Sequence, residues 1–171
     1  AALGVSQLKK VQSLIVAHQQ VYAWYREALS DMEELAWQGG RPDTVSVQWL
    51  TSVRMTSAEH RPALRDDLMQ RLRADGIDTR PFFYPMHHMP PYASNLPFPV
   101  ADSIASSGLN LPSSPHLTAS DVEFIAARVR AHVRDLNSRS LVAGANLMQG
   151  PVLMPPANVA AAHDGQLGVA A

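Results

Sequence analysis

The sequence contains no cysteine among its 171 residues. This absence excludes disulfide bonds, thiolate zinc sites and cysteine nucleophiles. It is compatible with a reducing compartment, and we expect a cytoplasmic location. No apolar run approaches the length of a membrane-spanning helix, and the N-terminus lacks the basic, apolar and small-residue zones of a signal peptide. The sequence therefore predicts no role in a membrane.

The sequence also lacks an excess of charge of either sign, because it contains 14 basic and 15 acidic residues and its net charge is −1. Binding to nucleic acid or to a membrane surface would favour a basic excess, so neither partner is expected. The common catalytic signatures are missing as well. The sequence has no glycine-rich phosphate loop, no His-Glu-x-x-His and no Gly-x-Ser-x-Gly motif.

What is present is a succession of helical and extended patterns. Residues 3–35 carry apolar groups at helical spacing, which predicts one long amphipathic helix of about 50 Å. A helix of that length often bridges to another domain. No cap residue precedes it and the chain does not begin with Met, so we expect upstream sequence to be missing.

The middle of the chain alternates between strands and helices. Residues 45–55 read as a strand, Pro62 opens a helix that Gly76 ends, and residues 77–83 read as a second strand. Residues 84–99 are rich in proline and aromatics and predict a loop. A short helix over 100–107 and a short extended segment over 109–111 follow. This order predicts an α+β fold, in which helices cover a small antiparallel sheet.

The last helix begins with a capping-box pattern at Thr118 and Asp121, and its apolar periodicity ends near Asn137. We therefore assign residues 1–137 to one domain. Residues 138–171 have no periodicity and only two formally charged side chains, Arg139 and Asp164. We expect this segment to be a disordered tail, although it is unusually apolar for one.

Four polar or aromatic side chains in and beside the loop are candidate binding groups. Arg80 offers a planar fork for phosphate or carboxylate, although an arginine at a strand end is equally typical of a structural ion pair. Tyr84 and Tyr92 offer flat faces and hydroxyls for a sugar or a base, although aromatics beside prolines usually pack. His87 can hydrogen-bond or exchange protons near neutral pH.

The adjacent His87 and His88 raise the question of a metal site. No carboxylate lies near them in the sequence, cysteine is absent, and adjacent side chains of an extended segment point to opposite sides. We therefore expect no metal. His18 and His132 lie on or near helical stripes, which is typical of packed or surface histidines.

Four segments of the chain carry recognisable motifs: AALGVSQLKKV, VSVQWLTSVRM, RDDLMQRLRADGIDTRPFFYPMHHMPPY and LNLPSSPHLTASDVEFI. The third segment is highly specific, with Gly-Ile-x-Thr-Arg followed by Tyr-Pro-x-His. In the same order, the four segments resemble the C-terminal third of the DegT/DnrJ/EryC1/StrS family of sugar aminotransferases. The resemblance extends over about residues 1–136, and His88 stands where relatives usually carry an apolar residue.

The resemblance implies the C-terminal small domain of a fold type I enzyme that uses pyridoxal phosphate (PLP). Such an enzyme transfers an amino group from glutamate to a keto-deoxy-sugar nucleotide. The amino-acid sequence of the loop most resembles that of family members whose substrate is a GDP-linked 4-keto-6-deoxy sugar, such as GDP-4-keto-6-deoxymannose. From their positions in the matched motif, the resemblance implies that four residues contact the substrate: Arg80, Tyr84, His87 and Tyr92. The implied partners are the nucleotide sugar and a large aminotransferase domain or a second copy in a homodimer.

The family's Schiff-base lysine and its PLP contacts lie upstream of the matched segments. The only lysines here are Lys9 and Lys10, and both stand in the wrong context for the Schiff base. We therefore expect no catalytic residue and no bound PLP in this chain alone. Three interpretations stay open: a truncated or split enzyme, a non-catalytic module for sugar-nucleotide binding or dimerisation, and the relic of a broken gene.

Overall fold

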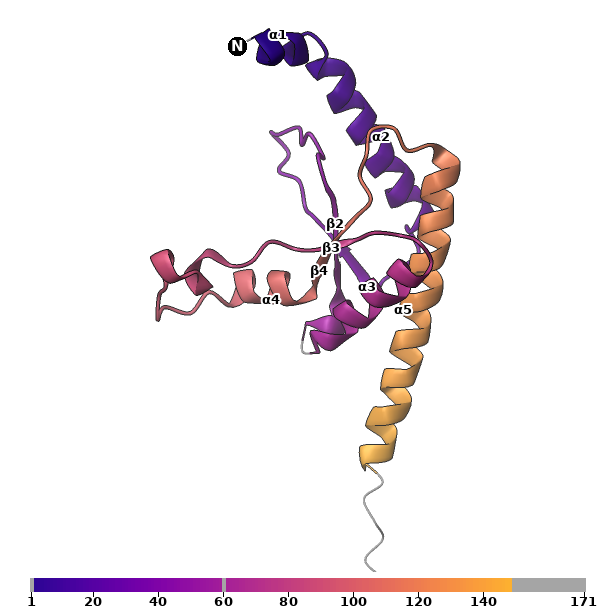
Figure 1. Cartoon of the computed structure of the whole chain (residues 1–171). Coiled ribbons are helices and arrows are strands. Elements are labelled where there is room, and N and C mark those ends of the chain that lie inside the picture. The colour runs from indigo at the N-terminus through magenta and orange to yellow at the C-terminus, as the bar shows by residue number, and fades with distance from the viewer. Residues whose placement is uncertain (1, 60, 149–171) are drawn as a thin grey trace, which may run out of the picture.

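The structure is a computed structural model that describes residues 2–59 and 61–148. Figure 1 shows a small sheet at the centre, long helices along one side of it, and a loop and helix projecting from the opposite side. Helices α2 (Val11–Ala28) and α3 (Ala63–Ala74) both pack against α5 (Ala119–Met148). Within the described ranges, no helix combines the length and the apolar character that crossing a bilayer requires.

The sheet has four antiparallel strands in the order β1-β2-β4-β3. Their bounds are Leu35–Trp37, Thr51–Met55, Arg80–Pro81 and Gly108–Leu111 for β1, β2, β3 and β4. Strand β4 is buried along its whole length because β2 and β3 flank it. This arrangement confirms the α+β fold and the antiparallel sheet.

The core lies between the sheet and the helices α2, α3 and α5. Tyr25 of α2 is fully buried, and its hydroxyl donates to the Pro112 carbonyl, which directly follows β4, over 3.1 Å. Burial raises the pKa of Tyr25, because the ionised phenolate would lose its hydration. Apolar side chains from every layer complete the core, among them Val21, Leu29, Val53, Met55, Leu68, Leu72, Leu109, Val122, Val129 and Val133.

The predicted single helix over residues 3–35 is wrong. The chain forms α1 (Ala2–Leu8), turns at Lys9 and Lys10, and then forms α2, which ends at Ala28. Beyond Ala28 the backbone leaves the helix, and the side chains of Leu29, Met32 and Leu35 enter the core. Leaving the helix also allows β1 to pair with β2. Tertiary packing therefore overrides the helical periodicity in this segment.

Both predicted strands are shorter than expected. Residues 45–50 are not part of β2, and Val45 and Trp49 are 85% and 62% exposed. Strands β1 and β4 pair with residues 51–55 only, so the alternating residues before Thr51 have no ladder to join. The strand expected over 77–83 contracts to Arg80–Pro81.

The predicted helices after residue 62 are confirmed as α3, α4 (Pro99–Ser107) and α5, and Gly76 after α3 has a φ of 80°. The capping box is also confirmed. The Thr118 N–H donates to the Asp121 carboxylate over 2.8 Å, and the Asp121 N–H donates to the Thr118 hydroxyl over 3.2 Å. Helix α5 continues past Asn137 to Met148, further than predicted. Residues 149–171 of the expected disordered tail lie outside the described residues.

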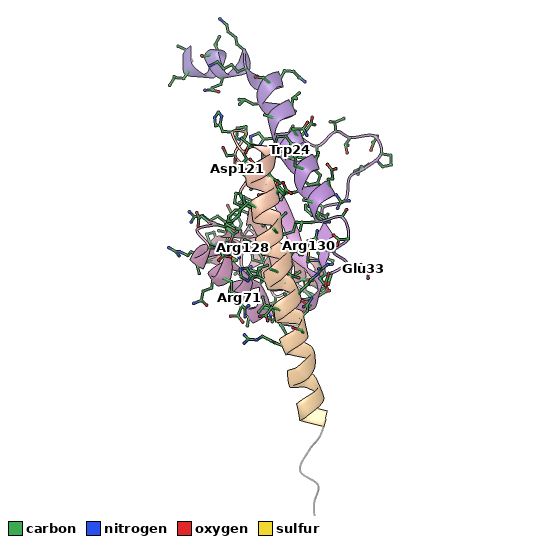
Figure 2. The ribbon with its side chains drawn as sticks, turned by 90° about the vertical axis from the view of Figure 1, so that its right-hand side faces the viewer. Trp24, Glu33, Arg71, Asp121, Arg128 and Arg130 are labelled. Carbon is green, nitrogen blue, oxygen red and sulfur yellow. The ribbon has the colours of Figure 1, made fainter. Side chains whose placement is uncertain are left out.

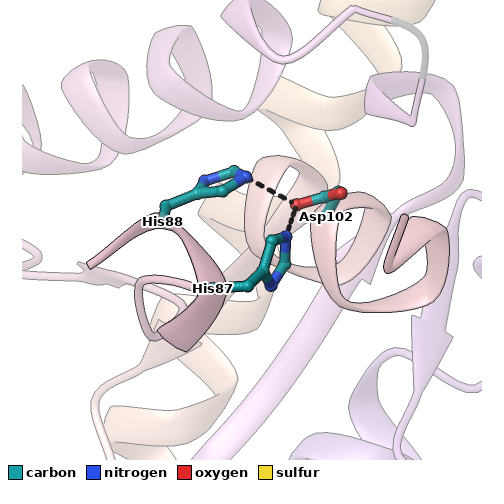
Figure 3. Close-up of side chains that lie close together, drawn as sticks. All are labelled: His87, His88 and Asp102. Atoms are coloured by element: carbon teal, nitrogen blue, oxygen red, sulfur yellow. Dashed lines mark hydrogen bonds and ion pairs between the residues drawn. The ribbon is translucent and has the colours of Figure 1, made fainter. Parts of the chain in front are cut away.

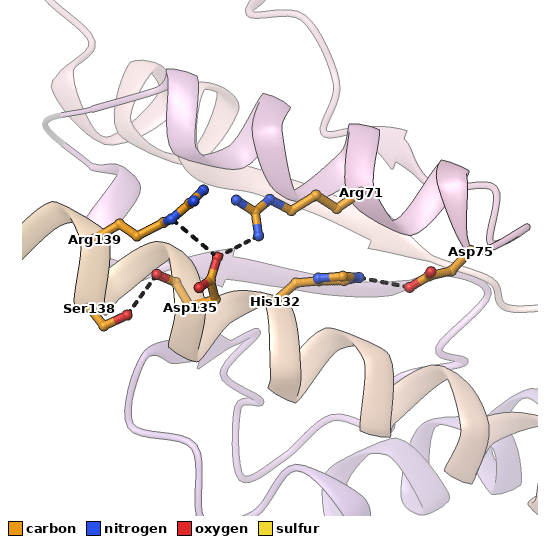
Figure 4. Close-up of polar contacts among 6 residues, drawn as sticks. All are labelled: Arg71, Asp75, His132, Asp135, Ser138 and Arg139. Atoms are coloured by element: carbon orange, nitrogen blue, oxygen red, sulfur yellow. Dashed lines mark hydrogen bonds and ion pairs between the residues drawn. The ribbon is translucent and has the colours of Figure 1, made fainter.

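Polar contacts hold α5 against α3 and against the segment that follows α2. Figure 4 shows Arg71 of α3 donating to Asp135 over 2.7 Å, and His132 beside Asp75 at 2.7 Å. Figure 2 shows Arg130 midway along the packed part of α5, and its guanidinium donates to the Asp31 carboxylate over 2.6 Å. His132 therefore lies at a helix contact, in agreement with its prediction as a packed or surface histidine.

Candidate functional site

The segment between β3 and β4 projects from the sheet, and we call residues 82–107 the arm. Figure 1 shows that a loop runs outward from β3 and that α4 returns to β4, on the side of the sheet away from α2 and α5. The arm exposes many large apolar side chains: Phe83, Tyr84, Met86, Met89, Tyr92, Leu96, Phe98 and Val100. Such a cluster is typical of a surface that contacts a ligand or another protein domain.

Two short 3-10 turns shape the outer part of the arm, η2 (Met86–His88) and η3 (Pro90–Tyr92). The prolines of this segment cannot continue a helix or a strand ladder, so the backbone closes tight turns instead. The His88 N–H donates to the Pro85 carbonyl over 3.1 Å, and the Tyr92 N–H donates to the Met89 carbonyl over 2.8 Å. The predicted irregular loop is therefore an ordered series of turns.

The base of the arm is held by Arg65 of α3 and by Gly108. The Arg65 guanidinium, whose side chain is 12% exposed, donates to the carbonyls of Ala105 and Gly108 over 3.0 Å each. These carbonyls belong to the C-terminal end of α4, where a cation is favoured. A Cβ at Gly108 would lie 2.6 Å from the Ile104 carbonyl oxygen and 3.0 Å from Cβ of Phe82. The close approach of the two sides of the arm therefore needs glycine.

Two histidines of the loop meet one carboxylate of α4 in the middle of the arm. Nε2 of His87 and Nε2 of His88 lie 2.9 and 3.1 Å from the same Oδ1 atom of Asp102 (Figure 3). The His87 ring also contacts Phe98 at a centroid distance of 4.7 Å, and the His88 ring contacts Tyr84 at 5.7 Å. The three residues form a cluster that ties the loop to the first turn of α4.

A groove lies beside this cluster, between the loop and the inner side of α4. Tyr84 and His88 line it from the loop, Asp102 and Ser106 line it from α4, and Arg65 lines it from α3. Its volume is about 1000 Å³, which is in the range of pockets for small molecules. A phenol, an imidazole, a carboxylate and a hydroxyl therefore face one open space, as recognition of a polar ligand requires.

The structure does not bring the four predicted site residues together. Arg80 lies in β3, is 77% exposed and pairs with Asp78 over 2.9 Å, which is the structural ion pair that the sequence left open. Tyr84 is 66% exposed and lines the groove. His87 is 12% exposed in its cluster, and Tyr92 is exposed in η3, outside the groove lining. Their contact with a substrate stays a prediction.

Sequence reasoning missed Asp102 and Arg65. Asp102 stands in the first turn of a helix, where acidic residues are common because they interact favourably with the helix dipole. Its position in the sequence therefore does not predict a contact with the two histidines. Arg65 lies in the specific segment of the resemblance, but only the return of α4 shows that its guanidinium faces carbonyl groups. Both residues take their roles from the fold of the arm.

Lys9 and Lys10 lie at the junction of α1 and α2, which is well separated from the arm (Figure 1). Both side chains are exposed. Lys9 borders a groove that is lined mainly by α2, together with Pro115 and Leu117. PLP enzymes place an acidic residue or an arginine at the pyridine nitrogen of the cofactor. The described lining of this groove includes neither. The residues around Lys9 do not fit PLP.

The fold places the chain among aminotransferases. TlmJ, an aminotransferase from Streptoalloteichus hindustanus, matches it with a TM-score of 0.69 at 27% identity, over 78% of this chain and 36% of that one. DesV from S. venezuelae, solved in complex with a ketimine intermediate, matches with a TM-score of 0.66 at 30% identity, over 77% of this chain and 35% of that one.

More specifically, residues 1–130 match the DegT/DnrJ/EryC1/StrS aminotransferase family, and the chain belongs to that family. This confirms the resemblance seen in four segments. GDP-perosamine synthase of Caulobacter vibrioides is 34% identical over 133 residues, which are 74% of this chain and 34% of that protein. GDP-perosamine synthase of Vibrio cholerae is 35% identical over 128 residues, with 73% and 34% covered. The chain therefore spans about a third of the length of these relatives.

Proposed function

We propose that the chain is the C-terminal small domain of a fold type I nucleotide-sugar aminotransferase and forms one wall of its substrate site. The groove of the arm carries this proposal, because it presents an exposed tyrosine and convergent polar groups beside a large apolar surface. A large aminotransferase domain, or a second copy in a homodimer, would cover that surface. Burying it would then close the groove around the substrate.

The proposed substrate is a GDP-linked 4-keto-6-deoxy sugar such as GDP-4-keto-6-deoxymannose, with glutamate as the amino donor. The similarity to two GDP-perosamine synthases supports this choice. Tyr84 is the best-placed candidate of the four predicted residues, because its exposed ring lines the groove and can pack against a sugar face. Tyr92 would reach the ligand from the end of the arm.

The other two candidates have partners within the chain. His87 is held by Asp102, so we propose that it positions the loop and affects the substrate through Tyr84. Arg80 would contact a phosphate only after exchanging its partner Asp78. An exposed pair of this kind contributes little stability, so a diphosphate could compete for the guanidinium.

PLP, when bound to an aminotransferase, supplies the electron sink for amino transfer and is linked to a lysine. Neither Lys9 nor Lys10 lies in a setting that fits this role. We therefore propose that PLP is held by another domain and that this chain alone does not catalyse the reaction. Its own contribution is to position the sugar and to exclude water from the groove.

The test is a complementation assay with the purified chain, PLP, glutamate and GDP-4-keto-6-deoxymannose. We expect no amino sugar from the chain alone, and product once the N-terminal two-thirds of the Caulobacter vibrioides relative is co-expressed with it. Turnover by the chain alone would contradict the assignment. Binding of the GDP-sugar by the chain without any complementation would instead favour a non-catalytic binding module.

A further inference from the structure

We propose that His87, His88 and Asp102 form a binding site for a transition-metal dication of the zinc type. The ion would link the loop to α4 beside the proposed substrate groove, so this inference rests on the same arm as the proposed function. Imidazole nitrogens and a carboxylate oxygen are the ligands that zinc takes in proteins, and three protein ligands leave one position open. Within the described residues, the candidate ligand atoms of these three side chains lie within 4.8 Å of one another.

The cluster already brings its ligand atoms near the spacing that a coordinated ion requires. Both Nε2 atoms converge on one oxygen of Asp102, at 2.9 and 3.1 Å, and Figure 3 shows both rings directed toward it. Ligand atoms around tetrahedral zinc are roughly 3.4 Å apart, since each bond is about 2.0–2.2 Å long. Each nitrogen–oxygen distance would therefore lengthen by a few tenths of an ångström, and the largest separation among the three ligand atoms, at most 4.8 Å, would shorten toward that spacing.

The folded structure removes two of the reasons for which the sequence argued against a metal site. Asp102 is absent from the neighbourhood of the histidines in the sequence, but α4 returns along the loop and places the carboxylate within reach of both rings. The histidines are not in an extended segment either. They belong to the 3-10 turn η2, which turns both rings toward the same carboxylate. Their ring centroids are 4.3 Å apart.

Both rings are already held in place, so binding would cost little conformational entropy. His87 is 12% exposed, packs against Phe98, and accepts the Ser94 N–H at its carbonyl over 3.3 Å. His88 packs against Tyr84 and is 46% exposed. His88 and Asp102 also line the groove, which provides a path for the ion and room for a fourth ligand such as water.

The ligand set predicts the class of ion. Two imidazoles and one carboxylate favour zinc, cobalt, nickel or copper, whereas magnesium and calcium prefer sites made entirely of oxygen. An ion held by loop and helix together would stabilise the arm, because it binds the folded arrangement and has no such site in the unfolded chain.

The experiment is isothermal titration calorimetry of the full chain, free of any affinity tag and pretreated with EDTA, with ZnCl₂ and separately with MgCl₂. We expect a saturable Zn²⁺ site and no Mg²⁺ binding. His88→Leu and Asp102→Asn should each weaken Zn²⁺ binding at least about 10–100-fold, a loss known even for residues behind the ligands. Zn²⁺ should also raise the Tm of the native chain and leave that of His88→Leu unchanged.

His116→Ala is the matched control, because this exposed histidine lies outside the arm and should leave Zn²⁺ binding intact. His88 is half exposed and Asp102→Asn conserves shape, so circular dichroism should show both variants folded. The proposal is overturned if the native chain binds no Zn²⁺ saturably, if folded His88→Leu and Asp102→Asn bind as tightly as the native chain, or if the control loses the site.

Discussion

Nε2 of His87 lies 2.9 Å from Oδ1 of Asp102, so the loop of the arm is tied to α4 by a contact between residues 15 positions apart. The contact is sheltered, because His87 is 12% exposed and Phe98 packs against its ring. Tyr84, which lines the groove, precedes the turn that carries His87. The position of the proposed substrate-facing wall therefore depends on an internal histidine–carboxylate pair.

Removing that pair should loosen the loop without unfolding the domain. In metal-free buffer we expect His87→Ala to increase amide hydrogen exchange over residues 86–92, because the turn loses its link to Asp102 and its packing on Phe98. Mass spectrometry of peptides from this segment measures the change. His116→Ala serves as control, and equal exchange in His87→Ala and the native chain would show that the pair does not hold the loop.

The base of the arm makes a separate prediction at Gly108. Gly108→Ala should destabilise the chain by about 1–3 kcal/mol, because the new Cβ would lie 2.6 Å from the backbone oxygen of Ile104, which cannot move alone. Gly39→Ala is the control, since a Cβ there meets nothing within 4 Å. Urea unfolding followed by circular dichroism gives both values. Equal midpoints for the two variants would contradict the close approach.

The contacts of α5 predict a loss of stability in acid. Hydrogen bonds from Arg71 and Arg130 lower the pKa values of Asp135 and Asp31 below the usual value of about 3.9. A carboxyl group with a lowered pKa stabilises the folded chain above its unfolded pKa, and this contribution disappears as the pH falls through the folded pKa. The urea midpoint should therefore fall as the pH drops below about 4.

Arg71→Met tests the origin of that acid sensitivity. The variant should be less stable than the native chain at neutral pH and should lose less stability on acidification, because Asp135 then titrates near its ordinary pKa (Figure 4). Arg73→Met is the control, as Arg73 is exposed on the same helix. Parallel pH profiles for the native chain and Arg71→Met would exclude the Arg71–Asp135 pair as a source of the effect.

Exposed apolar groups on α1 and the start of α2 predict self-association of the isolated chain. The exposed apolar side chains of this segment are Leu3, Val5, Leu8, Val11 and Val16. Leu8→Glu combined with Val11→Glu should reduce the association, because the charges disfavour burial of this face. Light scattering across a concentration series measures it. Val45→Glu, in the exposed loop before β2, should not matter, and a monomeric native chain would refute the prediction.

Much of the fold could be predicted from local patterns because the patterns and the packing agree. The segment from Pro62 to Gly76 and the capping box at Thr118 and Asp121 carry their own start and stop signals. Helix was predicted correctly for most of the first segment, but its end was not, because the apolar periodicity continues past Ala28 while the side chain of Leu29 packs in the core outside the helix. Strand β1 was missed for the same reason, since only its pairing with β2 distinguishes it from helix.

The candidate site was predictable as a segment but not as a geometry. Proline and aromatic content marked the loop, and Tyr84 does line a groove there. The sequence could not show that Asp102 approaches two histidines, because that contact depends on α4 folding back along the loop. Nor could it decide between the two interpretations of Arg80, whose ion pair with Asp78 is a property of the turn before β3.

The proposed role of the arm as a substrate wall is tested most directly in a chimera. Residues 1–136 would replace the matching C-terminal third of the Caulobacter vibrioides GDP-perosamine synthase, and kcat/KM for GDP-4-keto-6-deoxymannose would be measured with and without Tyr84→Ala. We predict that the chimera turns over and that Tyr84→Ala lowers kcat/KM by about tenfold while bound PLP is unchanged. A folded, PLP-loaded chimera that is inactive, or indifferent to Tyr84→Ala, would contradict the assignment.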